Sequence, residues 1–271
     1  MALPTPAPDR TALVTGASSG IGVEIARDLA RRGHGVTLVA RREDRLADLA
    51  AELADAHGVR AEVVGADLAD PADRAGLVGA VEGRGLTVDV LVNNAGLTTS
   101  GPVHRGDVEA ELRMVRVDVE AVVDLTTRFL AGMVERGRGA LLNVASVAAF
   151  QPLPGQAGYG GAKAFVLSYT QAVAAEVKGT GVSVSALCPG PVRTGFGEAG
   201  GLDAEESEAA LPSFMWVAAD EVARAGVAGL ERGRTVTIPG PANLVGAHAG
   251  RLAPRSLLLP LMARQHPALR R

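Results

Sequence analysis

A tyrosine and a lysine stand four residues apart in the sequence YGGAK, a spacing that suits proton transfer by Tyr159 and Lys163. Side chains four positions apart lie on one face of a helix, so both can point into the same cleft. A nearby ammonium favours the phenolate and lowers the pKa of the phenol, which adapts it to acid–base chemistry near neutral pH. Taken alone, the pair is better explained as an ordinary helical turn, because tyrosine and lysine at this spacing are common.

Two glycines inside the same stretch argue against an ordinary helix. Gly160 and Gly161 each cost a helix up to about 1 kcal/mol relative to alanine, so helix propensity does not explain them. Close packing against a cofactor or a neighbouring helix would explain both. With Ser146 thirteen residues before the tyrosine and a nucleotide-binding loop near the N-terminus, these residues favour a catalytic interpretation.

The nucleotide-binding loop is the stretch VTGASSGIG, which follows the first apolar run and has glycines at positions 16, 20 and 22. Glycine lets the backbone turn sharply and approach a ligand, and the free N–H groups at a helix N-terminus attract an anion. We expect the loop to hold a pyrophosphate, although its spacing differs from the G-x-G-x-x-G fingerprint. A tight strand-to-helix turn without a ligand is the alternative.

The choice between NADP and NAD is expected just after the second strand. A carboxylate at that place accepts hydrogen bonds from the ribose hydroxyls of NAD, whereas the 2′-phosphate of NADP requires arginine. This chain has Arg41 and Arg42 there, which favours NADP over NAD. Glu43 and Asp44 follow directly, so a shifted loop would reverse the preference.

Composition excludes several other classes of function. The chain has 271 residues and a net charge of −3 with both signs interspersed, so we expect a small-molecule partner and no nucleic acid. The single cysteine, Cys188, cannot form an internal disulfide, which fits a reducing, cytoplasmic location, and it is expected to be a small buried apolar residue. No histidine has a neighbour at ligand spacing, so no metal is expected. Neither a secretory signal nor a membrane-spanning run is present, which predicts a soluble protein.

Seven short apolar runs alternate with longer segments of helical spacing. Apolar runs without clean alternation are typical of strands buried on both faces, and segments such as EIARDLARRG place apolar residues three or four apart. The alternation predicts an α/β fold with a doubly wound, mainly parallel seven-stranded sheet and helices on both faces. The expected strands are residues 11–15, 35–40, 61–66, 88–93, 140–145, 182–187 and 235–238.

One domain is expected, with an N-terminal arm, a lid segment and a C-terminal extension. Residues 1–9 contain three prolines and are expected to form a short disordered arm. Residues 10–240 are expected to form the nucleotide-binding catalytic domain, in which 195–215 mixes glycines, acids and large apolar residues and suits a mobile lid. Residues 241–271 form a basic C-terminal extension, which from Arg251 onward has five arginines and no acids.

Several motifs in a fixed order resemble the short-chain dehydrogenases/reductases. The matching stretches are TGASSGIG at 15–22, NNAG at 93–96, Ser146, YGGAK at 159–163 and PGPVRT at 189–194. Their joint match extends over residues 10–240 and is far more specific than any single motif. The resemblance implies a Rossmann-type fold and hydride transfer between a nicotinamide and a carbonyl or alcohol carbon, with Tyr159 giving or taking the proton.

The resemblance also assigns roles to other residues. Lys163 would tune the phenol and hold the nicotinamide ribose, while the Ser146 hydroxyl would bind the substrate oxygen. The NNAG segment would bridge adjacent strands and leave room beside NADP(H). The cofactor-binding residues implied in this way are Gly16, Ser18, Ser19, Gly20, Ile21, Gly22, Arg41, Arg42, Asp67, Leu68, Asn94, Ala95, Gly96, Tyr159, Lys163, Pro189, Gly190, Val192 and Thr194.

Asp118 departs from the family pattern. Family members often have asparagine in the helix after NNAG, where it completes a catalytic tetrad, and here the matching stretch is VRVDVEAVV. The asparagine's role is ascribed largely to a main-chain carbonyl that holds a water next to the lysine, and aspartate can present the same carbonyl. We therefore expect Asp118 to be the fourth catalytic residue. Altered pairing of Lys163 and a simple helix-interior acid are the alternatives.

The substrate pocket is expected between the segment after Ser146 and the lid. An apolar ketone, aldehyde or secondary alcohol would suit the large apolar side chains there. The candidate lining residues are Phe150, Leu153, Phe196, Phe214, Met215 and Trp216.

The arginine-rich tail has two interpretations. Arginines together with leucines suit anionic lipid or a lipid-like substrate. Pro254 and Pro260 would break a long interfacial helix, which favours packing over the lid or against a partner subunit. The resemblance adds association through the helices corresponding to 107–136 and 159–179, which implies a homodimer or homotetramer.

Three functions follow from the sequence. The first is an NADP(H)-dependent carbonyl reductase or alcohol dehydrogenase. The second is a non-catalytic NADP-binding member of the family, which the retention of Tyr159 and Lys163 disfavours. The third is a peripheral-membrane reductase of lipid-like substrates, which would require the tail.

Overall fold

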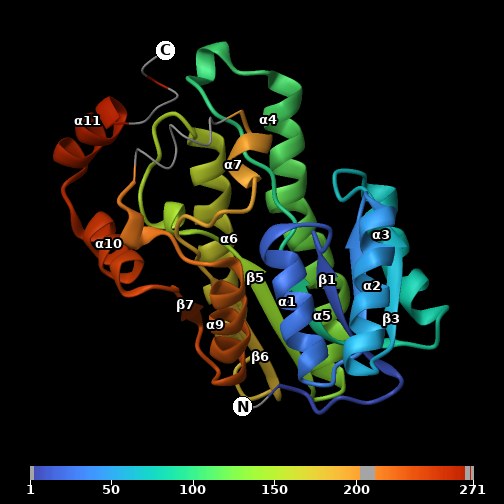
Figure 1. Ribbon diagram of the computed structural model, residues 1–271. Helices are drawn as coiled ribbons and strands as arrows, with labels where there is room; N and C mark the ends of the chain where they lie inside the picture. Colours follow the sequence, from blue (N-terminus) through green and yellow to red (C-terminus); the bar gives the residue numbers. More distant parts are fainter. Residues whose placement is uncertain (1–2, 202–210, 266–268, 270–271) are drawn as a thin grey trace.

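The computed structural model describes residues 3–201, 211–265 and 269, without the side chains of 198, 199 and 265, and contains one seven-stranded parallel sheet (Figure 1). The strand order is β3-β2-β1-β4-β5-β6-β7, so the direction of winding reverses between β1 and β4. The strands are β1 (Arg10–Thr15), β2 (Val36–Ala40), β3 (Ala61–Gly65), β4 (Thr87–Asn93), β5 (Gly139–Val144), β6 (Val182–Leu187) and β7 (Val236–Thr237).

Helices cover both faces of the sheet. Figure 1 shows α1 (Gly20–Arg31), α2 (Glu43–His57) and α9 (Ala219–Glu231) in front of the strands. The opposite face is covered by α3 (Pro71–Glu82), α5 (Ala121–Glu135) and α6 (Ala157–Glu176). Successive strand residues supply the two cores, with Val14 packed under the first helix layer and Leu13 under the second. Burial on both faces is why the strands read as continuous apolar runs.

Local signals define several helix ends. The carboxylate of Asp70 accepts from the backbone N–H of Ala72 and caps α3, whose first residue is Pro71. The carboxylate of Asp107 caps α4 (Val108–Val115) in the same way. Gly58, with φ of +65°, ends α2 in the left-handed conformation that glycine adopts without strain.

The expected doubly wound α/β sheet is confirmed, and all seven strands are parallel. Every expected strand agrees with the structure to within one residue at each end. In the expected lid segment the structure has α7 (Phe196–Ala199) and the short helix η4 (Ser213–Met215), while residues 202–210 lie outside the described residues.

Residues 3–9 differ from the disordered arm expected of them. Leu3 packs against the core under α1, and the carbonyl of Thr5 accepts a hydrogen bond from the Arg138 guanidinium. The carbonyl of Asp9 accepts from the backbone N–H of Thr87 at 2.9 Å. Apolar contact and backbone hydrogen bonds therefore hold residues 3–9 in place, although their prolines suggested disorder.

The C-terminal extension forms two helices, α10 (Pro241–Leu252) and α11 (Arg255–Gln265). Helix α10 packs against the short helix η3 (Val147–Phe150), and its buried Ala247 joins the same apolar cluster as Phe150. Asn243 donates to the carbonyl of Met215 at 2.9 Å, which links α10 to η4. The first part of the extension is thus packed against the segment that follows Ser146.

A buried polar network joins the central strands to α6. The Asn93 amide donates to Asn143 Oδ1 at 2.9 Å, and the Asn143 amide donates to Thr170 Oγ1 at 3.0 Å. Thr170 in turn donates to the carbonyl of Val166 at 2.6 Å. Because these side chains are buried and hydrogen-bonded to one another, the network fixes α6 against β4 and β5.

Asn143→Ala should therefore lower the free energy of unfolding by about 2–4 kcal/mol, because it removes one hydrogen bond from the buried Asn93 amide and one from the buried Thr170 hydroxyl. Urea denaturation would measure the change. Thr127→Ala is the control, since it removes an exposed hydroxyl that bonds only within α5 and should cost less than about 0.5 kcal/mol. Equal losses in the two variants would contradict a structural role for the network.

Candidate active site

A cleft of about 940 Å³ opens at the carboxyl ends of the strands, where the winding of the sheet reverses. Ligands of doubly wound sheets bind at this point. Most of the residues expected in the site line the cleft, whereas Gly22 and Asp118 lie behind its wall. The expected residues that line it are Gly16, Ser18, Ser19, Gly20, Ile21, Arg41, Arg42, Asp67, Leu68, Asn94, Ala95, Gly96, Ser146, Tyr159, Lys163, Pro189, Gly190, Val192 and Thr194.

The glycine loop forms one wall of the cleft by close backbone packing. Gly16 and Gly20 have φ of +66° and +60°, which side-chain-bearing residues rarely adopt. A Cβ on Gly22 would lie 2.4 Å from the carbonyl oxygen of Gly16, so this position accepts only glycine without a backbone shift. Ser19 precedes α1 without capping it through its side chain, which leaves the first N–H groups of α1 available to an anion.

Arg42 lies over this loop. Its guanidinium donates to the hydroxyls of Ser18 and Ser19, each at 3.0 Å. Within the described part of the chain no carboxylate lies within ion-pair distance of Arg42, Arg41 or Arg45, all of which border the cleft. This end of the cleft is therefore positively charged and able to take a phosphate group.

Asp67 is paired across the same end of the cleft. Arg113 from α4 contacts its Oδ2 at 2.6 Å, and both residues border the cleft. Partial burial raises the pKa of Asp67, but the hydrogen bond and charge of Arg113 outweigh it, so the pKa lies below its usual value. Arg113 is a neighbour of the expected cofactor site that the motifs did not indicate.

The NNAG segment bridges the two central strands and continues the cleft. The side chain of Asn94 donates to the carbonyl of Thr15 at 2.8 Å, while Thr15 Oγ1 accepts from the backbone N–H groups of Asn94 and Ala95. A Cβ on Gly96 would lie 3.2 Å from Asp118 and 3.3 Å from Lys163 Nζ. Glycine here allows the strand end to approach that charged pair closely.

Ser146, Tyr159 and Lys163 meet at the inner end of the cleft. Ser146 follows β5 and its Oγ accepts from the backbone N–H of Ala148 at 3.1 Å, so its hydroxyl proton is available to the Tyr159 phenol or to a ligand. Lys163 Nζ is buried, lies 5.7 Å from the centre of the Tyr159 ring and donates to the carbonyl of Val144 at 3.1 Å. The expected i, i+4 pairing on one face of α6 thus holds in the structure.

Asp118 forms a buried ion pair with Lys163. It lies in a five-residue π-helix, Arg116–Glu120, between α4 and α5, a local widening often found at functional sites. Its Oδ2 is 2.9 Å from Lys163 Nζ, and its Oδ1 accepts from the backbone N–H of Leu97 at 2.7 Å. The altered pairing of Lys163 that the sequence left as an alternative is therefore present.

Burial and this pair set the charge of the site. Burial raises the pKa of Asp118, against the opposing effect of Lys163. Burial alone would lower the pKa of Lys163, but the Asp118 carboxylate and the Tyr159 phenol outweigh it and raise the pKa. The lysine is therefore an ammonium at neutral pH.

The pKa of Tyr159 is raised, opposite to the direction expected from the YGGAK spacing. Burial in the cleft is the largest cause. Lys163 lowers the pKa, as expected, and a hydrogen bond from Ser146 also lowers it, whereas the Asp118 carboxylate raises it further. The YGGAK spacing indicates the nearby lysine, but it indicates neither the burial of the phenol nor the charge of Asp118.

Apolar side chains line the part of the cleft where the substrate is expected, which we call the substrate end. Of the six expected lining residues, Leu153, Phe196, Met215 and Trp216 are present there. Phe150 is instead buried in the core beneath α10, and Phe214 projects into solvent, so these two expectations are wrong. Phe196 also packs on Tyr159, with ring centres 5.8 Å apart.

The glycines of YGGAK have different environments. A Cβ on Gly160 would lie 3.0 Å from Leu153 Cβ, so this glycine allows the cleft wall to approach α6. Gly161 faces open space, and nothing in the structure explains it.

Cys188 lies just behind the site. It is fully buried, as expected, and burial raises its pKa to about 12, so it is a neutral thiol. Within the described residues no three His, Cys, Asp or Glu side chains are grouped as metal ligands would be.

Comparison with known proteins decides the family. The family profile for short chain dehydrogenases matches residues 10–203, which is most of the chain. The chain belongs to the short-chain dehydrogenase/reductase family of oxidoreductases. The motif-based identification is therefore confirmed, and the cleft described above occupies the position of the nucleotide-binding motifs in this family.

Three proteins are examples of those that are similar to this short-chain dehydrogenase/reductase in sequence or structure. The very-long-chain 3-oxoacyl-CoA reductase of Anas platyrhynchos is 36% identical over 192 residues, covering 68% of this chain and 60% of the relative. A short-chain dehydrogenase from Sphingobium yanoikuyae in complex with NADPH has a TM-score of 0.78 and 37% identity, with 89% and 94% of the two chains covered. The bulky-bulky ketone specific alcohol dehydrogenase from Comamonas testosteroni has a TM-score of 0.74 and 31% identity, with 95% and 100% covered.

Some residues that line the cleft lie outside the family motifs. Arg45 lies on α2, one turn beyond the arginine pair, and helical spacing could have indicated it. Gln156 donates to Thr98 Oγ1 at 2.8 Å across the substrate end, and Met262 reaches the cleft from α11. Gln156 lies close to YGGAK but belongs to no motif, and Met262 is far along the chain from every motif, so no local signal in the sequence indicated these two residues.

Asp118→Asn should lower the pKa of Tyr159. The substitution removes a negative charge that raises this pKa and leaves the lysine charge, which lowers it. Tyrosinate absorbance gives a direct measurement, because the chain has only two tyrosines and a Tyr159→Phe variant supplies the background from Tyr169. The titration midpoint of Tyr159 should move to lower pH. An unchanged or higher midpoint would contradict the electrostatic role of Asp118.

Proposed function

We propose that this enzyme is an NADP(H)-dependent oxidoreductase that interconverts a carbonyl and a primary or secondary alcohol, with Tyr159 as the general acid and base. The observation that supports this most is the meeting of Tyr159, Ser146 and a buried Lys163 in one cleft that continues to the glycine loop. Membership of an oxidoreductase family agrees with it.

The residues present fit a nicotinamide dinucleotide. The closely packed glycines leave room that a Cβ would fill. The arginines at the far end, which have no carboxylate partner among the described residues, suit a 2′-phosphate. Glu43, which could have favoured NAD, lies against Gly65 rather than in the cleft. NADPH bound to the Sphingobium relative supports the same choice. The cofactor, when bound, supplies the hydride.

The chain's own groups handle the proton and the substrate oxygen. Ser146 has one acceptor site occupied by the backbone, and its hydroxyl proton, which interacts with Tyr159 when no substrate is present, would turn to the substrate oxygen. Tyr159, with its raised pKa, is a neutral phenol at neutral pH and can donate its proton to that oxygen during reduction. In the oxidative direction the phenolate would accept the proton.

Lys163 stabilises the phenolate that proton donation leaves behind. Its ammonium is held toward the ring by the carbonyl of Val144 and the carboxylate of Asp118. We propose that Asp118 acts on the relay through this pairing and not by touching the substrate, because it lies behind the wall of the cleft.

An apolar carbonyl compound is the proposed substrate class. The lining side chains Leu153, Phe196, Met215 and Trp216 offer apolar surface, and polar groups gather at the inner end of the cleft. Two of the relatives named above act, by their names, on 3-oxoacyl-CoA and on bulky ketones, which agrees with a ketone substrate.

A homodimer or homotetramer is also proposed. Helix α4 exposes Val108, Leu112 and Val115, and α6 exposes Phe165. These helices lie in the expected association segments, and an apolar partner surface would cover side chains that are otherwise in water. A non-catalytic role is disfavoured because the complete proton-transfer group is assembled.

Tyr159→Phe should lower kcat by about a hundredfold or more while NADPH binding is unchanged, because it removes the proton donor and keeps the ring. NADPH oxidation over a panel of aldehydes and ketones, with fluorescence titration of NADPH, would test this. Tyr169→Phe is the control, since Tyr169 stacks on Phe165 away from the cleft. Full activity in the Tyr159 variant would refute the proposed acid.

Arg42→Ala should weaken NADPH binding by roughly ten- to a hundredfold, the effect of one charge-assisted hydrogen bond, and leave NADH binding within about threefold. Dissociation constants for both cofactors would be compared by fluorescence. Arg60→Ala, which removes an exposed arginine paired with Glu62, should change neither. Equal losses for the two cofactors would show that Arg42 does not read the 2′-phosphate.

A further inference from the structure

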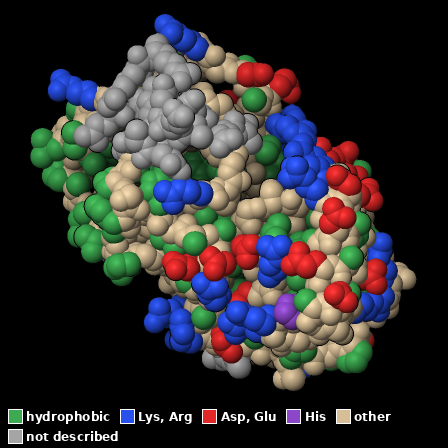
Figure 2. All heavy atoms as spheres, in the orientation of Figure 1, with side chains coloured by type: hydrophobic (Ala, Val, Ile, Leu, Met, Phe, Trp, Pro, Cys, Tyr) green, Lys and Arg blue, Asp and Glu red, His purple; other side chains and the backbone are tan. Residues whose placement is uncertain are grey.

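The two C-terminal helices expose an apolar face. On α11, Leu257 and Leu261 are 72% and 54% exposed, and on α10, Val245 and Leu252 are 68% and 83% exposed. Leu244 beside them is exposed too. Figure 2 shows hydrophobic side chains gathered at the left of the molecule, where α10 and α11 lie in Figure 1. We call these five residues the C-terminal face.

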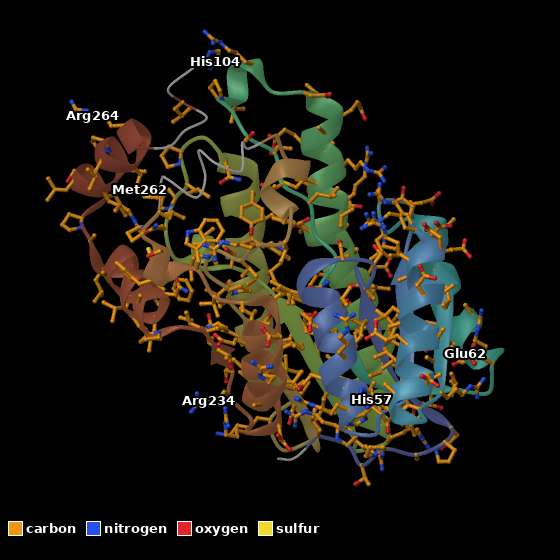
Figure 3. All side chains as sticks on the ribbon, in the orientation of Figure 1. His57, Glu62, His104, Arg234, Met262 and Arg264 are labelled. Atoms are coloured by element: carbon orange, nitrogen blue, oxygen red, sulfur yellow. The ribbon has the colours of Figure 1, made fainter. Side chains whose placement is uncertain are left out.

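Positive charge accompanies this face. Residues 232–271 contain seven arginines and no Asp or Glu, so the remaining 231 residues hold 20 of the 27 basic residues and all 30 acidic ones. Arg251 and Arg255 are exposed at the junction of the two helices, and Figure 3 shows Arg264 on the outer side of α11. The charge of the chain is thus strongly divided between its body and its C-terminal segment.

The inner side of the same segment belongs to the cleft. Met262 of α11 lines the substrate end, together with the partly exposed Phe196 and Leu211. Arg255 donates to the carbonyls of Gly250 and Phe150, which fixes the start of α11 over η3. One side of α11 therefore borders the cleft while the other is apolar and basic.

The prolines do not prevent an interfacial surface. Pro254 lies between α10 and α11, so the chain forms two short helices instead of one long one. Pro260 lies inside α11 and is itself exposed next to Leu261. Among the described residues no helix is long and apolar enough to cross a bilayer, so a surface position is the geometry that these helices offer.

We propose that the C-terminal face docks on an anionic lipid surface and thereby places the substrate end of the cleft at the membrane. Leucines and valines enter the acyl boundary of such a surface while arginines meet its headgroups. A second copy of the chain is a poorer occupant, because a symmetric contact would bring two basic faces together without any acid between them. Docking does not depend on the proposed reaction, and its test requires no turnover.

Vesicle co-sedimentation of the full chain tests the proposal, with phosphatidylcholine alone and with added phosphatidylglycerol. The wild type should sediment with the anionic vesicles and be released as NaCl rises from about 0.05 to about 0.5 M. Leu257→Gln/Leu261→Gln should weaken partitioning at least about tenfold, since two leucines no longer enter the lipid. Arg251→Glu should weaken binding to the anionic vesicles.

The matched control is Val108→Gln/Leu112→Gln on α4, a pair with the same spacing and exposures of 68% and 45%. It should leave vesicle binding unchanged, and equal thermal midpoints would show that all variants are folded. Wild-type protein that stays in the supernatant would overturn the proposal. So would vesicle binding that both double variants retain equally. Light scattering adds a third test, because it measures the molecular mass of each variant in solution. If the wild type does not bind vesicles and the mass falls only in the Leu257→Gln/Leu261→Gln variant, the C-terminal face would be assigned to contact with a second copy of the chain.

Discussion

The buried ion pair between Lys163 and Asp118 is the interaction on which the cleft depends. An ammonium and a carboxylate removed from water are tolerated only when each is paired and hydrogen-bonded, and losing one partner of such a pair typically costs about 3–5 kcal/mol. Here the carbonyl of Val144 and the backbone N–H of Leu97 complete the partners. The pair thus joins the ends of β4 and β5, the π-helix and α6 at one point.

The same pair sets the acidity of the site. A lysine alone would pull the phenol of Tyr159 toward ionisation, but the aspartate behind it offsets much of that charge. Asp118 stands where related enzymes often have asparagine, which carries no such charge. The chain therefore combines the proposed proton-transfer residues with a counterion that raises the pKa of the phenol.

The cleft changes character along its length. Its outer end near the glycine loop is bordered by arginines, its middle by small residues of the NNAG segment, and its substrate end by apolar side chains. Each region suits a different chemical part of the proposed dinucleotide and its substrate. The C-terminal helices extend the apolar end outward, because α11 borders the cleft on one side and exposes leucines on the other.

The sequence by itself determined the features that depend on neighbouring residues. Apolar runs located each strand to within one residue, and the glycine loop and the Tyr159–Lys163 spacing identified the family and the face of α6. Only the tertiary structure decided that Asp118 reaches Lys163, that Arg113 pairs with Asp67, and that Phe150 is core while Met262 lines the cleft. Each of these features depends on contacts between residues that are distant along the chain, so no local sequence pattern encodes it. The pKa of Tyr159 was also decided only by the tertiary structure, because the burial of the phenol and its distances to other charged groups are set when the chain folds.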